Sequence, residues 1–221
     1  SMGFVISTQN YEEVGAFIEL ADDLNVDQII FIPLAPVGNA KDSEGLNLTP
    51  HQYVETAQKI AEKKSSLGLK DDFVVLDFAP PLLVDYMNRT YGSKLLEEPK
   101  WCFAGTGSLF IRADGRVYPC KGYVEEYGDG NGRAGTYSLL EKTLPEILGG
   151  EYFDEIFQLS APALLEGELP ECKKCKYFLT YCKPCPRAAS NPEKDTAELC
   201  LGFKVGEICE EVKKAEEVYH D

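Results

Sequence analysis

Two Cys-x-x-Cys pairs in the C-terminal half restrict how this chain can fold more than any other feature of the sequence. Cys172 and Cys175 form the first pair, Cys182 and Cys185 form the second, and all four lie within fourteen residues. A tight turn between cysteines three positions apart points both sulfurs the same way, so each pair can grip a metal. Half of the eight cysteines therefore gather in one short segment, which predicts a metal-stabilised region.

Three kinds of chemistry use cysteines at this density. A disulfide framework is typical of small secreted domains, and neither the length of 221 residues nor the opening sequence, which lacks a signal-peptide pattern, favours it. One zinc ion held by the four central thiolates leaves Cys102, Cys120 and Cys200 without a role. Iron–sulfur ligation uses the whole set, because each four-iron cluster takes up to four thiolates and seven cysteines nearly fill two clusters.

Composition excludes several other classes of protein. Hydrophobic residues make up 44% and charged residues 27% of the chain, as in an ordinary globular protein. A net charge of −15 argues against a nucleic-acid partner, and no apolar run approaches the ~20 residues that span a bilayer. We expect a cytoplasmic protein without nucleic-acid or membrane partners. Its surplus carboxylates are either a solvated surface or an attraction for basic peptides.

Residues 1–95 alternate between strand and helix patterns. Three short apolar runs are typical of buried strands: Phe4–Ile6, Ile29–Ile32 and Phe73–Leu76. A helix stripe follows the first run, with Asn10 as its expected N-cap, and another follows the second, with a capping box at Thr49–Gln52 and a stop at Gly68. This order predicts an α/β fold with a parallel sheet.

The α/β part is short for a domain of this class. Three strands and two helices make neither a closed eight-stranded barrel nor a full doubly wound sheet. The opening Ser1-Met2 also looks like a remnant of tag cleavage. We therefore expect a chain that lacks an N-terminal half.

The character of the sequence changes after Pro80-Pro81. Ala113-Asp114-Gly115 sits between two apolar runs and predicts a short hairpin, followed by a glycine-rich loop over 122–136 and two amphipathic stretches over 138–148 and 151–159. A final helix over 203–219 carries Cys209 on its apolar stripe, where we interpret it as a core residue; the alternative is that it replaces Cys200 as a ligand. The expected domains are a partial β/α barrel over 1–95 and a cysteine-rich domain over 96–221.

The cysteine spacing resembles a known family. The order is Cys102, Gly115 with Cys120 after it, the segment Cys172-x2-Cys175-x6-Cys182-x2-Cys185, and Cys200. This pattern, with Trp101-Cys102-Phe103-Ala104-Gly105 and Val117-Tyr118-Pro119-Cys120, resembles the SPASM domain, the auxiliary-cluster module at the C-terminus of many radical S-adenosylmethionine (SAM) enzymes. The segment from Pro33 to Gly38, before a helix that opens at Thr49-Pro50, resembles the late strands of that family's partial TIM barrel. The implied fold is a β/α-barrel segment followed by a small, loop-rich α+β SPASM domain with a β-hairpin.

The resemblance implies two 4Fe–4S auxiliary clusters. Three cysteines would hold the first cluster (Cys102, Cys120 and Cys185), and four would hold the second (Cys172, Cys175, Cys182 and Cys200). Two departures bear on this assignment: the central run here is x6 then x2, where the family pattern has x5 then x3, and Leu95–Glu98 offers no thiol as a fourth ligand to the first cluster. The fourth position of the first cluster would then be an open iron, or would hold a carboxylate or an external ligand. An open iron there could bind a substrate thiol.

The family's reaction also needs a Cys-x3-Cys-x2-Cys loop, and this sequence contains none. We therefore expect the isolated chain to be inactive, and SAM to be bound only by the full-length enzyme. The implied role is that of a peptide or protein maturase or of an oxidoreductase acting on a small molecule, with a precursor peptide as one possible partner. Unpaired barrel strands would favour self-association.

The other motifs carry little chemistry. Gly130–Gly135 matches G-x-G-x-x-G but lacks the surrounding β-α-β unit, so we interpret it as a flexible loop. Neither His51 nor His220 has an evident partner in the sequence, and no catalytic residue is assigned. Pro36-Val37-Gly38 either borders the SAM or substrate pocket, as the resemblance implies, or is a plain turn. The alternative to the redox function is a zinc-stabilised binding module, and zinc can also replace clusters in protein purified in air.

Overall fold

The computed structural model describes residues 1–34, 45–95, 100–101, 103–120, 137–159, 174–183 and 205–218. Several features singled out in the sequence lie outside these residues: Cys102, Cys172, Cys185, Cys200, Pro36-Val37-Gly38, the loop over 122–136 and His220.

A parallel three-stranded sheet forms the centre of the N-terminal part. Its strands are β1 (Met2–Ile6), β2 (Ile29–Pro33) and β3 (Val74–Leu76), arranged in the order β1-β2-β3. Phe4 pairs with Phe31 in one parallel register, and Phe31 pairs with Leu76 in the other. The sequence prediction of three short parallel strands is confirmed.

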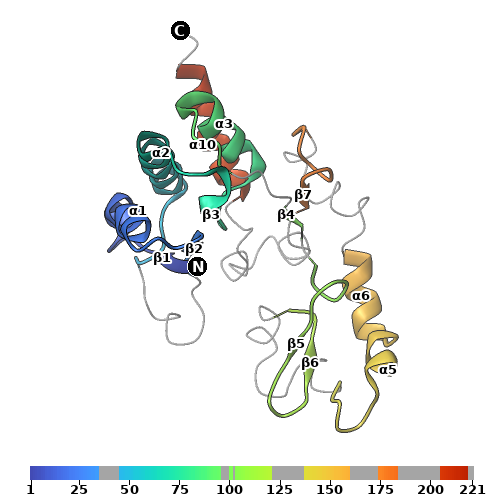
Figure 1. Ribbon diagram of the computed structural model, residues 1–221. Coiled ribbons are helices and arrows are strands. Elements are labelled where there is room, and N and C mark those ends of the chain that lie inside the picture. The colour runs from blue at the N-terminus through green and yellow to red at the C-terminus, as the bar shows by residue number, and fades with distance from the viewer. Residues whose placement is uncertain are drawn as a thin grey trace.

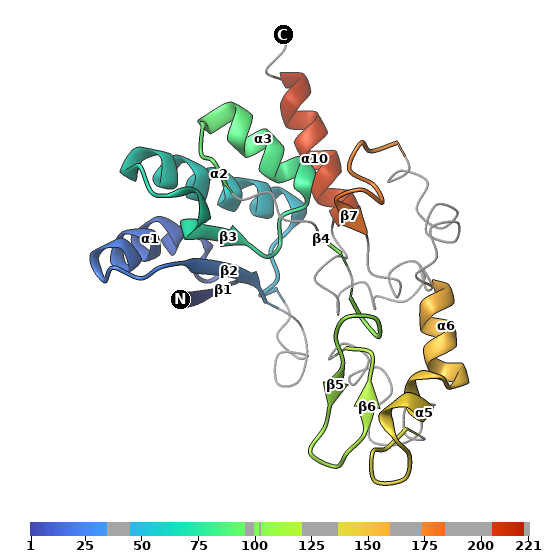
Figure 2. The same ribbon diagram turned by 45° about the vertical axis from the view of Figure 1, so that its right-hand side comes forward.

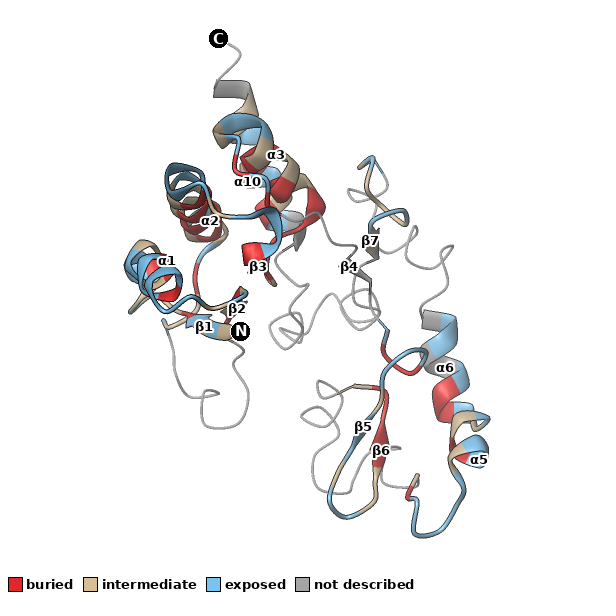
Figure 3. Cartoon of the chain, in the orientation of Figure 1, coloured by how far each residue is buried: buried red, intermediate tan, exposed pale blue. Residues whose placement is uncertain are grey.

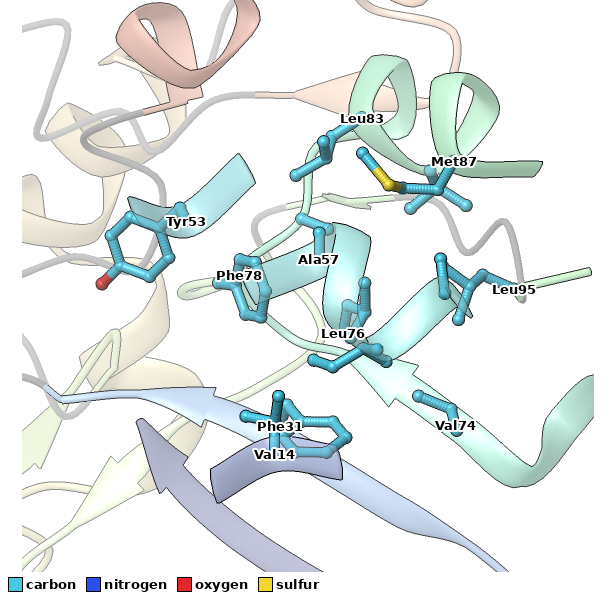
Figure 4. Packing of buried hydrophobic residues seen from close by; sticks show 14 of the residues in the cluster. Val14, Phe31, Tyr53, Ala57, Val74, Leu76, Phe78, Leu83, Met87 and Leu95 are labelled. Atoms are coloured by element: carbon cyan, nitrogen blue, oxygen red, sulfur yellow. The ribbon is translucent and has the colours of Figure 1, made fainter. Parts of the chain in front are cut away.

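Helices cover one face of this sheet (Figures 1 and 2). They are α1 (Val14–Asp23), α2 (Pro50–Leu67) and α3 (Pro81–Tyr91), with 3-10 turns η1 (Tyr11–Glu13) and η3 (Asp71–Phe73) before α1 and β3. Figure 4 shows the apolar core between helices and sheet, where Phe31, Leu76, Phe78 and Leu83 converge.

The predicted helix caps have different outcomes. Thr49 and Gln52 form the expected reciprocal capping box on α2, and Gly68 ends that helix in the left-handed region at φ 63°. Asn10 does not cap its helix through its side chain. Its Oδ1 instead accepts the backbone N–H of Ser7 at 2.8 Å, and its Nδ2 donates to the carbonyl oxygen of Val5 at 2.9 Å. The side chain of Asn10 therefore closes the turn after β1, which explains why it does not reach the helix.

The opposite face of the sheet is apolar and only partly covered. Val5 is 50% exposed, and Ile30, Ile32 and Val75 on the same face are of intermediate exposure. Parallel sheets are normally covered on both faces, by helices outside and by barrel side chains inside. An apolar face without helices is what the inner wall of a barrel segment requires, and the fold of this part is that of a β/α-barrel segment.

The last helix returns to the barrel segment. Helix α10 (Val205–Val218) packs against α2 and α3, and its buried Ile208 and Val212 belong to the same apolar core as the sheet. Cys209 lies beside them at intermediate exposure, at the edge of that core. The C-terminal helix therefore follows the cysteine-rich segment in sequence but shares the core of residues 1–95.

The middle of the chain forms a second, smaller core. Strands β5 (Phe110–Ile111) and β6 (Val117–Tyr118) make the predicted hairpin, with Gly115 at φ 82°. Helices α5 (Leu144–Leu148) and α6 (Glu151–Leu159) pack beside it, as Figure 3 shows by their buried residues. That core consists of Val117, Tyr118, Ile147, Tyr152 and Phe153.

The first amphipathic stretch becomes helical later than its sequence predicts. Ser138 pairs with Arg116, and the N–H of Leu139 donates to the carbonyl oxygen of Gly115 at 2.9 Å. These residues extend the hairpin, so α5 begins only at Leu144. A further parallel pair joins β4 (Lys100–Trp101) to β7 (Cys182–Lys183). Across the described ranges, no helix is both long enough and apolar enough to span a membrane.

Candidate metal-cluster site

Cys120 lies at the end of the hairpin, two residues after β6. Pro119, directly before it, accepts a hydrogen bond through its carbonyl oxygen from the backbone N–H of Gly105 at 3.1 Å. Gly105 belongs to a tight loop over 103–108, in which the carbonyl oxygen of Phe103 accepts three backbone N–H groups at 2.9–3.1 Å. The chain that follows Cys102 in sequence is thereby fastened beside the chain that leads into Cys120.

The side chain of Cys120 is half-buried and packs against the smaller core. An apolar neighbourhood limits the access of water to a cluster ligand and so influences the redox potential of the metal. The hairpin thus offers one thiol at the border between a packed core and the loop that follows Cys102.

Cys175 and Cys182 lie at the two ends of a closed loop. The carbonyl oxygen of Cys175 accepts the N–H of Phe178 at 3.0 Å, and that of Cys182 accepts the N–H of Leu179 at 2.9 Å. The N–H of Cys182 donates to the carbonyl oxygen of Tyr177 at 2.9 Å. Leu179 occupies the left-handed region at φ 58°, which reverses the chain. The backbone therefore fixes the two cysteines relative to each other.

The pairing of β4 with β7 brings this loop to the start of the cysteine-rich region. Lys100 is paired with Cys182 and Trp101 with Lys183. Trp101 directly precedes Cys102 in the sequence. The structure therefore connects three of the predicted ligand regions: the β4 end, the hairpin end and the Cys175–Cys182 loop.

Three of the seven predicted ligands lie within the described residues, namely Cys120, Cys175 and Cys182, each of intermediate exposure. Within the described ranges, no three His, Cys, Asp or Glu side chains gather as a metal site. The donor set nevertheless fits an iron–sulfur cluster in its chemistry, because soft thiolates are the ligands of such clusters and these three sit at backbone-fixed turns. The assignment of individual cysteines to two clusters stays a prediction.

An ionic junction lies beside the Cys175–Cys182 loop. Asp85 on α3 accepts hydrogen bonds from Arg89 Nε at 3.2 Å and from Lys176 Nζ at 3.3 Å. Desolvation of this mostly buried carboxyl opposes ionisation, but the hydrogen bond from Lys176 and the charge of Arg89 outweigh it and keep the pKa of Asp85 below its usual value. No local sequence pattern predicts this junction, because Asp85 and Lys176 are 91 positions apart.

His51 acquires a partner that its sequence neighbourhood does not show. Its Nδ1 lies 3.6 Å from Glu211 Oε2 on α10. The two side chains line a hollow of about 210 Å³ between α2 and α10, together with Val54, Glu55 and Gln58. The pair helps fasten α10 to α2, and the described residues that line the hollow include no cysteine.

The central part of the chain matches a known family. Residues 102–176 match the sequence profile of SPASM, described as an iron-sulfur cluster-binding domain. Curated relatives include probable GTP 3',8-cyclases of Saccharolobus islandicus, strains L.S.2.15 / Lassen #1 and M.14.25 / Kamchatka #1. Each is 26% identical over 155 residues, which cover 70% of this chain and 43% of the relative.

Solved structures share the fold. Native anSMEcpe with bound AdoMet and Kp18Cys peptide has a TM-score of 0.59 and 19% identity, covering 98% of this chain and 56% of that one. Native anSMEcpe with bound AdoMet has the same TM-score at 18% identity and 55% coverage of its chain. This chain carries a SPASM domain over residues 102–176, and over most of its length it is similar to these radical SAM proteins. It spans about half the length of the relatives it matches.

The SPASM match begins at Cys102 and includes Cys120, Cys172 and Cys175. The Gly105–Pro119 hydrogen bond therefore lies inside the domain, and it ties the domain's first residues to its hairpin. Asp85 lies outside the matched residues, on the barrel segment, although it contacts the domain through Lys176.

Proposed function

We propose that this chain binds two 4Fe–4S auxiliary clusters and that the complete enzyme uses them in maturing a peptide or protein. The first cluster would be held by Cys102, Cys120 and Cys185, and the second by Cys172, Cys175, Cys182 and Cys200. When bound, such a cluster supplies one-electron redox capacity and, at an iron without a protein ligand, a place for a substrate atom. Because the chain contains no Cys-x3-Cys-x2-Cys loop, it would not cleave SAM alone. Thiolate ligands require a reducing compartment, so a cytoplasmic location is part of the proposal.

The hydrogen bond between Gly105 and Pro119 is the observation that carries this proposal. It fastens the loop that follows Cys102 to the strand end that carries Cys120, as a cluster shared by these two cysteines requires. The loop between Cys175 and Cys182, which is closed by backbone hydrogen bonds, supports the proposal of a second cluster in the same way. The residues of this chain would thus hold and orient the clusters, whereas the chemistry on SAM would belong to parts of the enzyme that carry the missing motif.

A peptide is the substrate class that the charge of the chain favours. A net charge of −15 attracts a basic peptide and repels a nucleoside triphosphate. The similar anSMEcpe structure contains a bound peptide, which supports the same choice. The curated relatives are probable GTP 3',8-cyclases, and a nucleotide is therefore the second candidate substrate.

Metal analysis of the chain purified without oxygen tests the cluster proposal. Two clusters correspond to about eight iron atoms and about eight acid-labile sulfides per chain. One zinc ion without sulfide would instead identify a zinc-stabilised binding module. Protein purified in air is unsuitable, because exposed clusters degrade and zinc can take their place.

Separate replacement of cysteines tests the division into two clusters. Cys120→Ala and Cys172→Ala should each remove about half of the iron, because they are assigned to different clusters. Cys209→Ala is the matched control and should keep all of the iron, since Cys209 lies at the edge of the core that α10 shares with the barrel segment. Complete loss of iron in either single variant would contradict two independently bound clusters.

Calorimetric titration of the iron-loaded chain distinguishes the two substrate classes. A lysine-rich peptide with one cysteine should bind, and raising the salt concentration should weaken the binding. GTP with magnesium should give no heat of binding. Binding of GTP without binding of the peptide would replace the peptide by a nucleotide.

A further inference from the structure

Asp85 is shared between two cations from different parts of the chain. Arg89 lies one turn further along the same helix, while Lys176 comes from the cysteine-rich segment. The Asp85 side chain is only 18% exposed, compared with 53% for Arg89 and 67% for Lys176. A mostly buried carboxylate needs partners, because water cannot fully solvate it. Lys176 and the neighbouring Tyr177, which also hydrogen-bonds the carboxylate, are the partners supplied by the other part of the chain.

Lys176 directly follows Cys175, which gives this contact its position in the site. The ammonium group also lies 4.7 Å from the centre of the Tyr177 ring. At its other end the same loop is fastened through Cys182, which pairs with Lys100 in the β4–β7 ladder. Each end of the loop is therefore attached at or beside a cysteine assigned to the second cluster.

The loop between these two attachments is internally rigid. The N–H groups of Phe178, Leu179 and Cys182 all donate to carbonyl oxygens within the loop at 2.9–3.0 Å. A rigid loop held at two points has a defined orientation. If one point is released, the loop can pivot about the β4–β7 pair, and both cysteines move with it.

We propose that Asp85 is a positioning residue that docks the Cys175–Cys182 loop onto α3 through Lys176. It thereby sets where the second auxiliary cluster lies relative to the barrel segment. The role in cluster placement rests on the proposed function, whereas the docking of the loop rests on the contacts alone. Asp85 is not assigned any contact with substrate or SAM.

Hydrogen exchange of the loop amides, followed by mass spectrometry, tests the docking. Asp85→Asn and Lys176→Met should each speed exchange in the segment 177–183 by about two- to fivefold, the range expected for one ion pair, because the hydrogen bonds within the loop open more often once one attachment is lost. The double variant should exchange no faster than Asp85→Asn alone, because the loss of the carboxylate charge already removes the ion pair with Lys176. Lys176→Arg should restore the slow exchange.

A matched control removes a carboxylate elsewhere. Asp72 lies 3.7 Å from Lys70 and is well exposed, so Asp72→Asn should leave the loop unchanged. Exchange in 177–183 that does not change in Asp85→Asn and Lys176→Met would overturn the proposal. Equal acceleration of exchange throughout α3 in both variants would also overturn it, since that result means unfolding of the helix. Lys176→Met is included because its side chain is exposed and lies outside α3, so this substitution should leave the helix folded.

Iron content and spectra of the iron-loaded protein distinguish failure of the cluster proposal from failure of the positioning role of Asp85. Asp85→Asn should keep the full iron content and alter the electron paramagnetic resonance signal that Cys172→Ala removes, while the signal that Cys120→Ala removes stays unchanged. If the wild-type chain binds no iron, the proposed function fails, and the exchange experiment still decides the docking. If it binds iron and the exchange and the spectra do not respond, the positioning role of Asp85 fails alone.

Discussion

The backbone N–H of Gly105 donates to the carbonyl oxygen of Pro119 at 3.1 Å. This bond joins the loop after Cys102 to the strand end before Cys120. Gly105 adopts a φ of 73°, in the left-handed region that favours glycine. Part of the cysteine site is therefore organised by backbone hydrogen bonds. A cluster bound there would add to this organisation by closing longer loops.

The hairpin turn should tolerate only glycine at position 115. Gly115 has a φ of 82°, and a Cβ there would meet Leu140 Cγ at 3.2 Å and Ser138 Oγ at 3.3 Å. Gly115→Ala should lower the free energy of unfolding by about 2 kcal/mol, from backbone strain and crowding together. Chemical denaturation followed by circular dichroism measures this change.

Gly92→Ala is the matched control for that substitution. Gly92 also has a positive φ, of 60°, but a Cβ there meets nothing within 4 Å. Its replacement should cost about 1 kcal/mol, the strain alone. Equal losses in the two variants would mean that the contacts with Leu140 and Ser138 do not matter.

Lys64 should be needed as an ammonium ion although it is buried in α2. It is 1% exposed, and burial lowers its pKa. Its Nζ donates to the carbonyl oxygens of Ser93 at 2.8 Å and Lys94 at 3.1 Å, which fixes the chain after α3. Lys64→Met leaves these oxygens without their donor and should lower the free energy of unfolding by about 2 kcal/mol.

Lys63→Met provides the comparison for Lys64→Met. Lys63 neighbours Lys64 on the same helix, but its side chain is one-third exposed and pairs with Glu19. A surface ion pair of this kind contributes about 0–1 kcal/mol. Thermal unfolding of the two variants should therefore differ clearly, and a larger loss for Lys63→Met would refute the structural role of Lys64.

Local patterns were sufficient to predict most of the barrel segment. The three strands and the helices α1 and α2 follow from apolar spacing, and the Thr49–Gln52 cap follows from two residues that contact each other within one turn. Helix α3 (Pro81–Tyr91) was not predicted. Asn10 shows the limit of this reasoning. The same residue type suits both a cap and a turn, and its bond to the Val5 carbonyl decides for the turn.

The candidate site was predictable only where residues close in sequence make it. The spacing of the cysteines indicates the metal chemistry, and Gly115 indicates the hairpin. The contact between Asp85 and Lys176, and the return of α10 to the barrel segment, join residues that are distant in sequence. In sequence, Asp85 and Lys176 look like ordinary surface charges, and α10 looks like an ordinary amphipathic helix. Only the fold shows what they contact.

The return of α10 leads to a stability prediction. Ile208 is 3% exposed and belongs to the core of the barrel segment. Ile208→Ala should therefore lower the free energy of unfolding of that segment by about 2–4 kcal/mol, through lost burial and the remaining cavity. Glu207→Ala, at an exposed neighbouring position, should change it little. A similarly small effect for Ile208→Ala would mean that α10 does not pack there in solution.

Tyr53 should make the protein sensitive to alkaline pH. The residue is 4% exposed, its ring lies 5.2 Å from that of Phe78, and burial raises its pKa to about 12. An unfolded tyrosine has a pKa of about 10, so between pH 10 and 12 the unfolded chain loses a proton that the folded chain keeps. Stability from this group is therefore complete below pH 10 and falls as the pH rises, by about 1 kcal/mol at pH 11.

Tyr53→Phe keeps the ring but cannot ionise, so its free energy of unfolding should fall less than that of the wild type between pH 8 and pH 11. Denaturation curves at these two pH values measure the difference, and parallel losses in the two proteins would show that Tyr53 ionises equally easily in the folded and unfolded chains.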